Sequence, residues 1–288
     1  MRMLLIGADG QLGSDLRAHF AAACDLVPST TTDLDITDAD AVRRAVDRVR
    51  PDVIVNTAAY HNPVACEENP VTAFHVNAAA VRTLALAARD CGARLVHFST
   101  DYVFDGMKQS PYVENDCPNP LNVYGASKLA GEILARQAGA DSLILRISGI
   151  YGKTRCMGKG GNFINTMLRL YRDRKPIRVV TDEVLTPTST VDICQQLDVM
   201  LRHGLSGLYH VTNEGSCSWF EFARALFAGL ALDVDVQPAR VADFPSSVKR
   251  PPYSVLENAE LNRLGLNVMG DWKTALRYFL DHTNPETL

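Results

Sequence analysis

The alternation of apolar and polar positions predicts strands and helices in turn along the first half of the chain. Runs that are apolar on both faces, as in buried parallel strands, lie at 3–6, 53–56, 95–100 and 143–147, with a shorter one at 26–28. Helical periodicity is expected at about 14–23, 39–50 and 70–91, and from residue 124 onward. This order predicts an α/β fold with a Rossmann-type doubly wound parallel sheet.

The first strand runs directly into a glycine-rich turn that opens the first helix. Strand, glycine turn and helix in this order form the phosphate-binding unit of dinucleotide folds, because the glycines bring backbone N–H groups close to a pyrophosphate. We therefore expect NADPH or NADH at this turn. The candidate contacts are Gly7, Asp9, Gly10, Gln11, Leu12 and Gly13.

The rest of the expected cofactor site lies after later strands. The glycine pattern of dinucleotide-binding folds is followed by an acidic residue about twenty residues further on. The segment 29–36 supplies carboxylates but no arginine for a 2′-phosphate. The choice between NAD and NADP therefore stays open. Small residues after the third strand leave room for a flat cofactor. The candidates are Asp35, Ile36, Ala58, Ala59, Tyr60, Asn77, Ser99, Tyr124 and Lys128.

Tyr124 and Lys128 lie four residues apart at the start of a predicted helix, so they share one face. A nearby ammonium favours the phenolate, which makes Tyr124 a proton donor and acceptor near neutral pH. Thr100 ends the fourth strand at the same sheet edge. Together with a nicotinamide cofactor, the three residues suit ketone reduction: Tyr124 protonates the oxygen, Thr100 hydrogen-bonds it and Lys128 holds the cofactor ribose.

After residue 150 the alternation is less regular. Helices are predicted at 163–172, 191–202 with Thr190 as the cap, 218–230 and 272–282, and strands at 178–180 and 207–212. We divide the chain into an NAD(P)-binding domain, 1–150, and a smaller, mainly substrate-binding lobe, 151–288, with elements of about 176–212 returning to the main sheet. Residues 153–161 are expected to be a mobile connection. Trp219 and Phe222 are expected in the core.

Composition narrows the class of protein. The chain has 288 residues and a net charge of -4, so it has no basic footprint for nucleic acid. Met1–Ile6 is far too short to span a membrane. Seven cysteines without a Cys-x-x-Cys pair are typical of free thiols in a reducing compartment. We expect a cytoplasmic monomer or homodimer, no metal cluster, and no nucleic-acid or membrane partner.

Several stretches resemble one family, the extended short-chain dehydrogenases/reductases, and within it the dTDP-4-dehydrorhamnose reductase branch. The most specific stretches are Ser99–Gly106 and Pro120–Glu132. The resemblance implies a reductase of a nucleotide-linked 4-keto-6-deoxy sugar, with Thr100, Tyr124 and Lys128 as the catalytic set. It also implies that Arg250 meets the diphosphate. The sugar pocket would include Asp101, Tyr102, Asn162 and Phe163.

Some members of this branch bind Mg²⁺ and form dimers. Asp15 lies where one such carboxylate would be, but no matching cluster accompanies it, so no metal ligand is assigned and Mg²⁺ stays open.

Three departures from the branch lie on the substrate side. The usual Ser-Trp after the fifth strand reads Ser148-Gly149, and the usual Val-Asp pair near 63–64 reads Pro63-Val64. The usual Asp-Gln-x-Gly reads Asp182-Glu-Val-Leu185. The cofactor and catalytic side is intact, so we expect a reductase whose sugar is altered.

Two other classes remain open. Some relatives of reductases serve as non-catalytic NAD(P)-binding regulatory subunits, although these tend to lose part of the catalytic set that is retained here. A nucleotide-sugar epimerase or dehydratase uses the same fold. A dehydratase commonly has Asp-Glu after the threonine, whereas Thr100 is followed by Asp101 and Tyr102.

Overall fold

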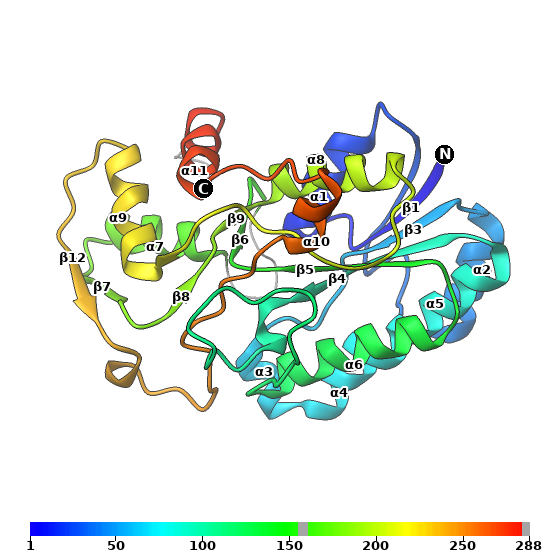
Figure 1. The fold of residues 1–288 in the computed structure, drawn as a ribbon, viewed down its shortest axis with the longest axis horizontal. Helices are drawn as coiled ribbons and strands as arrows, with labels where there is room; N and C mark the ends of the chain where they lie inside the picture. Colours follow the sequence, from blue (N-terminus) through cyan, green and yellow to red (C-terminus); the bar gives the residue numbers. More distant parts are fainter. Residues whose placement is uncertain (155–160, 284–288) are drawn as a thin grey trace.

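The computed structural model describes residues 1–154 and 161–283. Its centre is a six-stranded sheet in the order β10-β5-β4-β3-β1-β2, in which every pair is parallel (Figure 1). This confirms the predicted α/β fold class. The strands are β1 Arg2–Ile6, β2 Asp25–Ser29, β3 Val53–Asn56, β4 Arg94–Thr100, β5 Ser142–Ile147 and β10 Gly207–His210.

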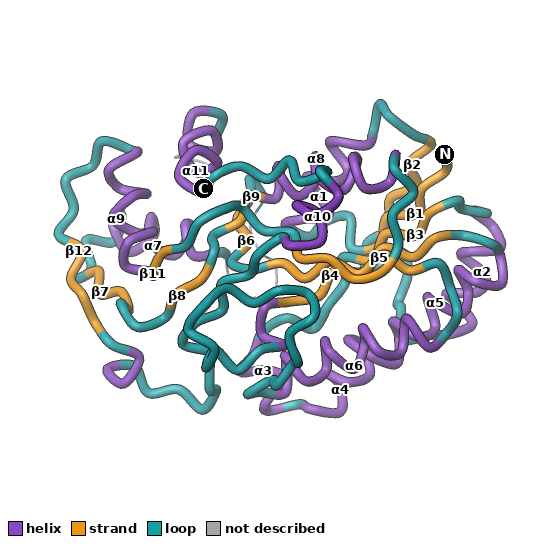
Figure 2. The backbone as a smooth tube through the Cα atoms, viewed as in Figure 1, coloured by secondary structure: helices purple, strands orange, loops and turns teal. Residues whose placement is uncertain are grey.

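Helices cover both faces of this sheet (Figure 2). On one face α1 (Gln11–Phe20) and α8 (Thr190–Arg202) enclose a core with Met3, Leu5 and their neighbours. On the other face a second core contains Leu4 and Ile6 and residues of the helices there. Alternate residues of one strand thus enter different cores, as a sheet buried on both faces requires. The second group of helices is α2 Ala39–Val49, α5 Ala80–Cys91 and α6 Val123–Gln137.

A third core belongs to a separate lobe beside the sheet. Its helices α7 (Phe163–Arg172) and α9 (Trp219–Gly229) pack on the parallel pair β7 (Ile177–Val180) and β12 (Val236–Ala239). Helix α11 (Trp272–Asp281) packs on α9. Short ladders join β6 to β9 and β8 to β11. The remaining bounds are β6 Ile150–Tyr151, β8 Val184–Leu185, β9 Thr188–Ser189, β11 Cys217–Ser218 and α10 Ala259–Leu264.

Within 176–212, helix α8 and strand β10 lie with the main sheet, whereas β7 pairs with β12 in the separate lobe. The division of the chain at residue 150 stays a prediction. Of the connection expected at 153–161, residues 155–160 lie outside the described part of the chain.

The segment 62–91 contains more than the single helix that we predicted at 70–91. Asn62 caps an additional helix, α3 (Pro63–Glu68), by accepting backbone hydrogen bonds from Val64 and Ala65. The following helix begins as α4 (Pro70–Phe74), widens into the π-helical turn η1 (His75–Ala79) and continues as α5. Helix α8 also differs at its start, since Ser189 rather than Thr190 is the N-cap residue.

Among the described residues, one helical segment, Pro70–Cys91, is long and apolar enough to cross a membrane by length and composition. Half of its most apolar window is buried inside the protein, where Val81, Leu84 and Ala88 pack in the second core. This is how the core helix of a soluble protein is placed, so the segment is weak evidence for a membrane span.

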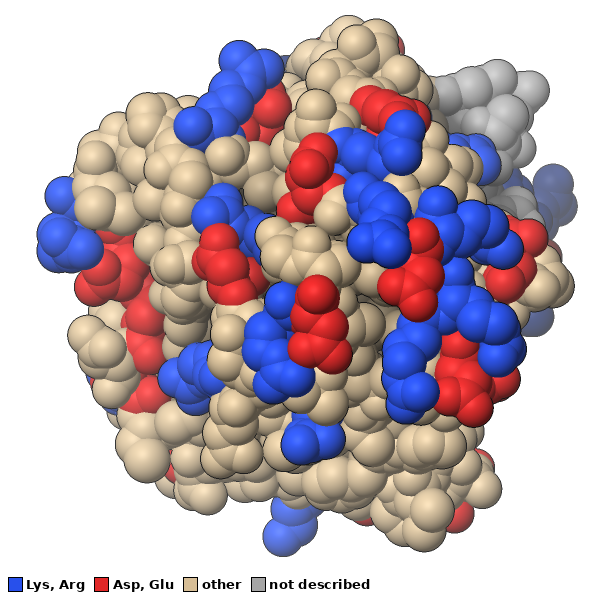
Figure 3. Space-filling view, turned by 90° about the vertical axis from the view of Figure 1, so that its right-hand side faces the viewer, with Lys and Arg blue, Asp and Glu red and all other residues tan. Residues whose placement is uncertain are grey.

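Charges of both signs are interspersed on the face drawn in Figure 3, which lies on the β2 and α2 side of the molecule. The Arg2–Asp25 ion pair joins β1 to β2, and the Arg43–Asp40 ion pair lies within α2. The described residues of this face therefore form no extended basic patch of the kind that nucleic acid binds.

A buried ion pair fixes α6 against the sheet. Arg146 of β5 donates from Nε and Nη2 to the two carboxylate oxygens of Glu132, at 2.9 and 2.7 Å. The side chains are 2% and 0% exposed. Ser99 at the end of β4 donates to the same carboxylate at 2.5 Å. One carboxylate thus joins α6, β4 and β5.

We predict that Arg146→Met lowers the free energy of unfolding by about 3–5 kcal/mol, because it leaves a buried carboxylate without its counter-charge. Denaturant unfolding measures this. Arg202→Met is the matched control, since Arg202 pairs with Asp198 on the surface, and its loss is expected to stay within about 1 kcal/mol. Similar losses of unfolding free energy in the two variants would contradict the conclusion that the buried ion pair fixes α6.

Candidate active site

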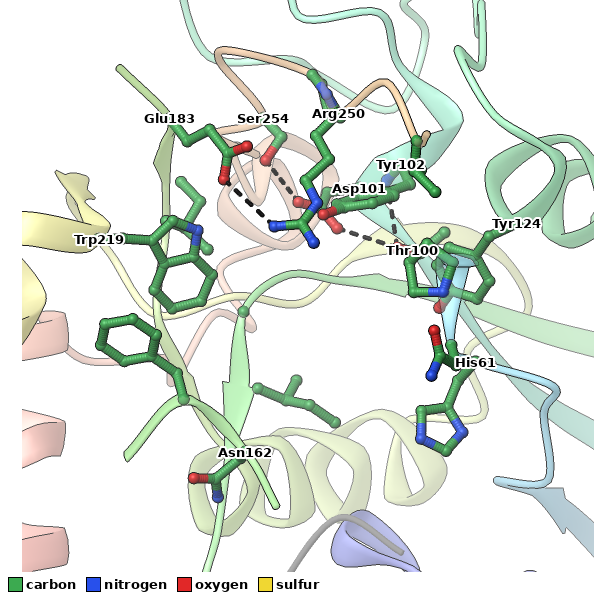
Figure 4. A pocket seen from close by; sticks show the side chains of 18 of the residues that line it. His61, Thr100, Asp101, Tyr102, Tyr124, Asn162, Glu183, Trp219, Arg250 and Ser254 are labelled. Carbon is green, nitrogen blue, oxygen red and sulfur yellow. Dashed lines mark hydrogen bonds and ion pairs between the residues drawn. The ribbon is translucent and has the colours of Figure 1, made fainter. Parts of the chain in front are cut away.

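A cavity of about 910 Å³ lies where the carboxyl ends of the strands meet the separate lobe. It is lined by the glycine turn, by residues after β3 and β4, by the start of α6 and by the lobe. Figure 4 shows Trp219 and Asn162 across this space from Tyr124 and His61. All three predicted catalytic residues, Thr100, Tyr124 and Lys128, line it.

The glycine turn brings α1 tightly against the end of β1. A Cβ on Gly13 would lie 2.0 Å from the carbonyl oxygen of Gly7, so only glycine allows this approach. Gln11 joins the turn to the lobe: its Nε2 donates to the carbonyl of Ile150 at 3.1 Å, and its Oε1 accepts from Nδ2 of Asn162 at 2.8 Å. Gly10, Gln11, Leu12 and Gly13 line the cavity, while Asp9 is exposed to solvent.

Asn77 holds the loop after β3 from behind. Its Oδ1 accepts from the backbone N–H of Tyr60 at 2.8 Å, and its Nδ2 donates to the Tyr60 carbonyl at 2.9 Å and to Ser127 at 3.0 Å. The π-helical turn η1 carries Asn77. Asn77 therefore contacts the loop from the core, whereas Ala59 of that loop lines the cavity.

The predicted adenosine contacts lie further from the cavity. Ile36 is buried in the second core. The Asp35 carboxylate accepts from the hydroxyl and the backbone N–H of Thr37, at 2.7 and 2.9 Å, and these bonds lower the pKa of Asp35. Asp35 thus stays ionised at the β2–α2 loop.

Thr100 is oriented by a buried carboxylate. Its hydroxyl donates to Asp101 at 3.0 Å, and Asp101 also accepts from Ser148 at 2.9 Å and Ser254 at 2.6 Å. Burial raises the pKa of Asp101, and the three hydroxyl donors oppose this shift. Ser148 and Ser254 were not predicted from the sequence; Ser254 is 153 residues from Asp101 along the chain.

Two tyrosines meet at the start of α6. The rings of Tyr102 and Tyr124 pack edge to face, with centroids 5.7 Å apart. Burial raises the pKa of Tyr102, so its phenol stays protonated. One turn along α6, Nζ of Lys128 donates to the carbonyl of Phe98 at 2.6 Å, and burial lowers the pKa of Lys128 to about 8.

The lobe side of the cavity carries an aromatic platform. Trp219 stacks on Phe163 with ring centroids 4.5 Å apart, and both line the cavity. Trp219 was predicted to fill the core; it is half-buried, packs against the core of the lobe and also lines the cavity. Trp219 is the first residue of α9, directly after its cap Ser218, and lies at the cavity wall, whereas Phe222 one turn later is fully buried.

The buried carboxylate of Glu183 faces Arg250, the residue that is expected to bind the diphosphate. The Glu183 carboxylate lies 4.0 Å from the guanidinium of Arg250 (Figure 4), and their side chains are 8% and 42% exposed. Burial raises the pKa of Glu183, and the Arg250 charge opposes this shift. Both residues line the cavity, so Arg250 is oriented at its wall before any ligand binds.

No group of three or more His, Cys, Asp or Glu residues that could hold a metal ion occurs within residues 1–154 and 161–283. Asp15 instead accepts a short hydrogen bond from the hydroxyl of Thr190, and burial raises the pKa of Asp15. This contact joins α1 to the start of α8.

The parallel sheet with its glycine turn and cavity defines a Rossmann-type nucleotide-binding protein. The RmlD substrate binding domain family matches residues 1–284, and the chain belongs to this family. The resemblance inferred from the sequence is thereby confirmed.

Curated relatives agree with this assignment over nearly their full lengths. The chain is 41% identical to a dTDP-4-keto-6-deoxy-D-glucose reductase of Streptomyces niveus, covering 96% of this chain and 95% of the relative. It is 36% identical to the spore coat polysaccharide biosynthesis protein SpsK of Bacillus subtilis, covering 97% and 96%. A crystal structure of dTDP-4-dehydrorhamnose reductase from Bacillus anthracis in complex with NADP superposes with a TM-score of 0.93 at 37% identity, covering 98% and 99%.

At the cavity wall, the side chain of Leu185 lies against Gly149. Gly149 has φ +53°, and a Cβ there would lie 2.5 Å from Cδ1 of Leu185. The branch that the sequence resembles usually has tryptophan at the first position and glycine at the second. In this chain the larger residue of the two is instead Leu185, and its side chain lies against Gly149.

We predict that Gly149→Trp costs about 1–3 kcal/mol more stability than Gly204→Trp, because only the first residue is overpacked against a neighbour. Gly204 has a similar φ of +64° with nothing within 4 Å of its Cβ position, so the strain of a left-handed residue is common to both. Denaturant unfolding measures the difference.

Adding Leu185→Gly to Gly149→Trp is expected to recover part of this loss. A double-mutant cycle without coupling between residues 149 and 185 would show that the side chain of Leu185 does not lie against residue 149.

Proposed function

We propose that this chain is an NADPH- or NADH-dependent reductase of a nucleotide-linked 4-keto-6-deoxy sugar. The observation that carries the proposal is the convergence of Thr100, Tyr124, Lys128 and the glycine turn on one cavity, in a member of this family. The relatives' names support the substrate class, since they specify reductases of dTDP-linked 4-keto sugars. A relative's structure with NADP supports the cofactor class.

In the proposed reaction a C4 ketone becomes a secondary alcohol. The bound reduced nicotinamide supplies the hydride to the carbon. Tyr124 gives its phenolic proton to the oxygen, and the resulting phenolate is reprotonated from solvent. Lys128, as an ammonium at the cofactor ribose, favours that phenolate by its charge.

Thr100 contributes through a change of hydrogen-bond partner. Its hydroxyl now donates to Asp101, and it turns to the substrate oxygen as negative charge develops there. Ser148 and Ser254 still donate to Asp101 after this turn, so the buried carboxylate keeps two partners. Asp101 can therefore release Thr100 at little cost.

On the substrate side, Arg250 suits the diphosphate because a guanidinium matches phosphate oxygens with two parallel hydrogen bonds. The Phe163–Trp219 platform suits a flat ring or the apolar face of a sugar. We assign the substrate side mainly to residues 151–288, and the protein to the cytoplasm as a monomer or homodimer. Mg²⁺ has no assigned role.

We further propose that the sugar differs from that of the rhamnose pathway. Leu185 beside Gly149, and Glu183 where the branch usually has glutamine, change the shape and charge of the same wall. Turnover of dTDP-4-dehydrorhamnose should therefore be slower than by an ordinary branch member. Equal turnover would contradict an altered sugar.

We predict that Tyr124→Phe lowers kcat at least about 100-fold, because the variant lacks the proton donor, while NADPH binding is kept. Cofactor oxidation with dTDP-4-keto-6-deoxy-D-glucose or dTDP-4-dehydrorhamnose measures the rate. Tyr102→Phe is the control: its ring packs on Tyr124, but its phenol is not the donor, so the loss should stay below about 10-fold.

Activity that survives Tyr124→Phe unchanged would exclude Tyr124 as the acid. Turnover without net cofactor oxidation would indicate an epimerase, and absence of any turnover by the native protein across nucleotide 4-keto sugars would favour a regulatory subunit.

A further inference from the structure

A buried chain of polar side chains lies behind the cavity, in the interior of the sheet. It consists of Asn56 at the end of β3, His97 of β4 and Lys128 of α6, which are 0%, 1% and 2% exposed. Nδ2 of Asn56 lies 3.3 Å from Nδ1 of His97, and Nε2 of His97 lies 3.4 Å from Nζ of Lys128. The cavity residue Lys128 is thus connected to a histidine that no ligand can reach directly.

The hydrogen bonds of Asn56 fix the tautomer of His97. The backbone N–H of Ala58 donates to Oδ1 of Asn56 at 3.1 Å, which sets the orientation of the amide. Its NH₂ group therefore faces His97 and donates to Nδ1, so Nδ1 is the acceptor. The ring proton of a neutral His97 is then on Nε2 and points at Lys128. An ammonium cannot accept that hydrogen bond, whereas a neutral amine can; the hydrogen bond that Nζ donates to the carbonyl of Phe98 at 2.6 Å is open to both forms.

We propose that His97 is a positioning residue that favours the neutral amine of Lys128 in the cofactor-free protein, so that cofactor binding takes up one proton at Lys128. The inference rests on the proposed contact of Lys128 with the cofactor ribose. On binding, ribose hydroxyls offer acceptors to Nζ, the amine gains a proton from the solvent and the contact with Nε2 of His97 breaks. No redox change is involved.

Burial and the nearby carboxylate act on the pKa of Lys128 in opposite directions, and burial has the larger effect. The acidic group that acts on Lys128 is Glu132 of the same helix, and its charge is held by Arg146 of β5 and by Ser99. Tyr124 is a further titratable residue on the same helix as Lys128. On the neighbouring elements β3 and η1, Asn56 and Asn77 are uncharged. Burial lowers the pKa of Lys128 to about 8, opposed by Glu132. Burial and then the charge of Lys128 hold the pKa of His97 well below its usual range.

Whether cofactor binding takes up or releases protons follows from the directions of these pKa shifts. Above about pH 8 the cofactor-free protein carries mostly the amine, and a ribose-bound ammonium has a higher pKa, so binding takes up protons. Well below that pH, Lys128 is protonated in both states and the uptake vanishes.

Titration calorimetry tests this directly. NADPH and NADH are each titrated into the native protein in two buffers of different ionisation enthalpy, at about pH 9 and about pH 6.5. We expect uptake of most of one proton at the higher pH and close to none at the lower. Lys128→Met sets the baseline, with no uptake at either pH.

His97→Gln tests the role of the histidine. The Gln amide can turn its oxygen toward Nζ and accept from the ammonium, so Lys128 should keep its proton and uptake at about pH 9 should fall at least twofold. Asn56→Asp tests the same point without changing His97. The new carboxylate accepts a hydrogen bond from Nδ1–H of His97, so Nε2 is unprotonated and can accept from Lys128. Proton uptake should therefore fall here as well. His210→Gln is the matched control, a buried histidine on β10 bonded to the Tyr112 and Glu257 carbonyls, and should leave uptake unchanged.

Cofactor binding without proton uptake at about pH 9, or native uptake in both His97→Gln and Asn56→Asp, would overturn this inference alone. If only one of the two variants folds, its uptake decides. Absence of any binding of NADPH or NADH by the native protein would instead overturn the proposed function, and this inference with it.

Discussion

The carboxylate of Glu132 is the contact on which the geometry of the site depends. It fixes α6 to the ends of β4 and β5 through Ser99 and Arg146 in a region without solvent. Lys128 and Tyr124 lie one and two turns earlier on the same helix, so their height above the sheet is set by this ion pair. A buried pair of this kind is a weak source of net stability, but breaking it is costly, which makes the position of the helix well defined.

A second set of contacts holds the lobe over the glycine turn. Gln11 bonds to Ile150 and Asn162, and Leu185 packs over Gly149. These contacts come from segments far apart in the sequence, and they place Trp219 of the aromatic platform across the cavity from Tyr124 (Figure 4). The catalytic side is thus built by the sheet and the substrate side by the lobe. The residues of the cavity wall that face the sugar can therefore change while the proton donor stays in place.

Features with a local cause could be predicted from the sequence. The glycine turn, the buried strands and the Tyr124–Lys128 spacing depend on neighbours in the chain, and the structure has each of them. Features set by distant contacts could not be predicted. Asn77 in the π-helical turn bonds to Tyr60 and Ser127, and Ser254 bonds to Asp101, only once the fold has brought these segments together. Trp219 packs against the lobe core and also lines the cavity, and the second contact depends on how the lobe meets the sheet, which the local sequence does not set.

Transfer of a labelled hydride tests the central claim most directly. With NADPH or NADH that carries deuterium at both C4 positions of the nicotinamide, and a nucleotide-linked 4-keto-6-deoxy sugar, NMR of the product should show deuterium at C4 of the sugar, with one oxidised cofactor for each product formed. A product without deuterium at C4, or conversion without net oxidation of the cofactor, would contradict the account.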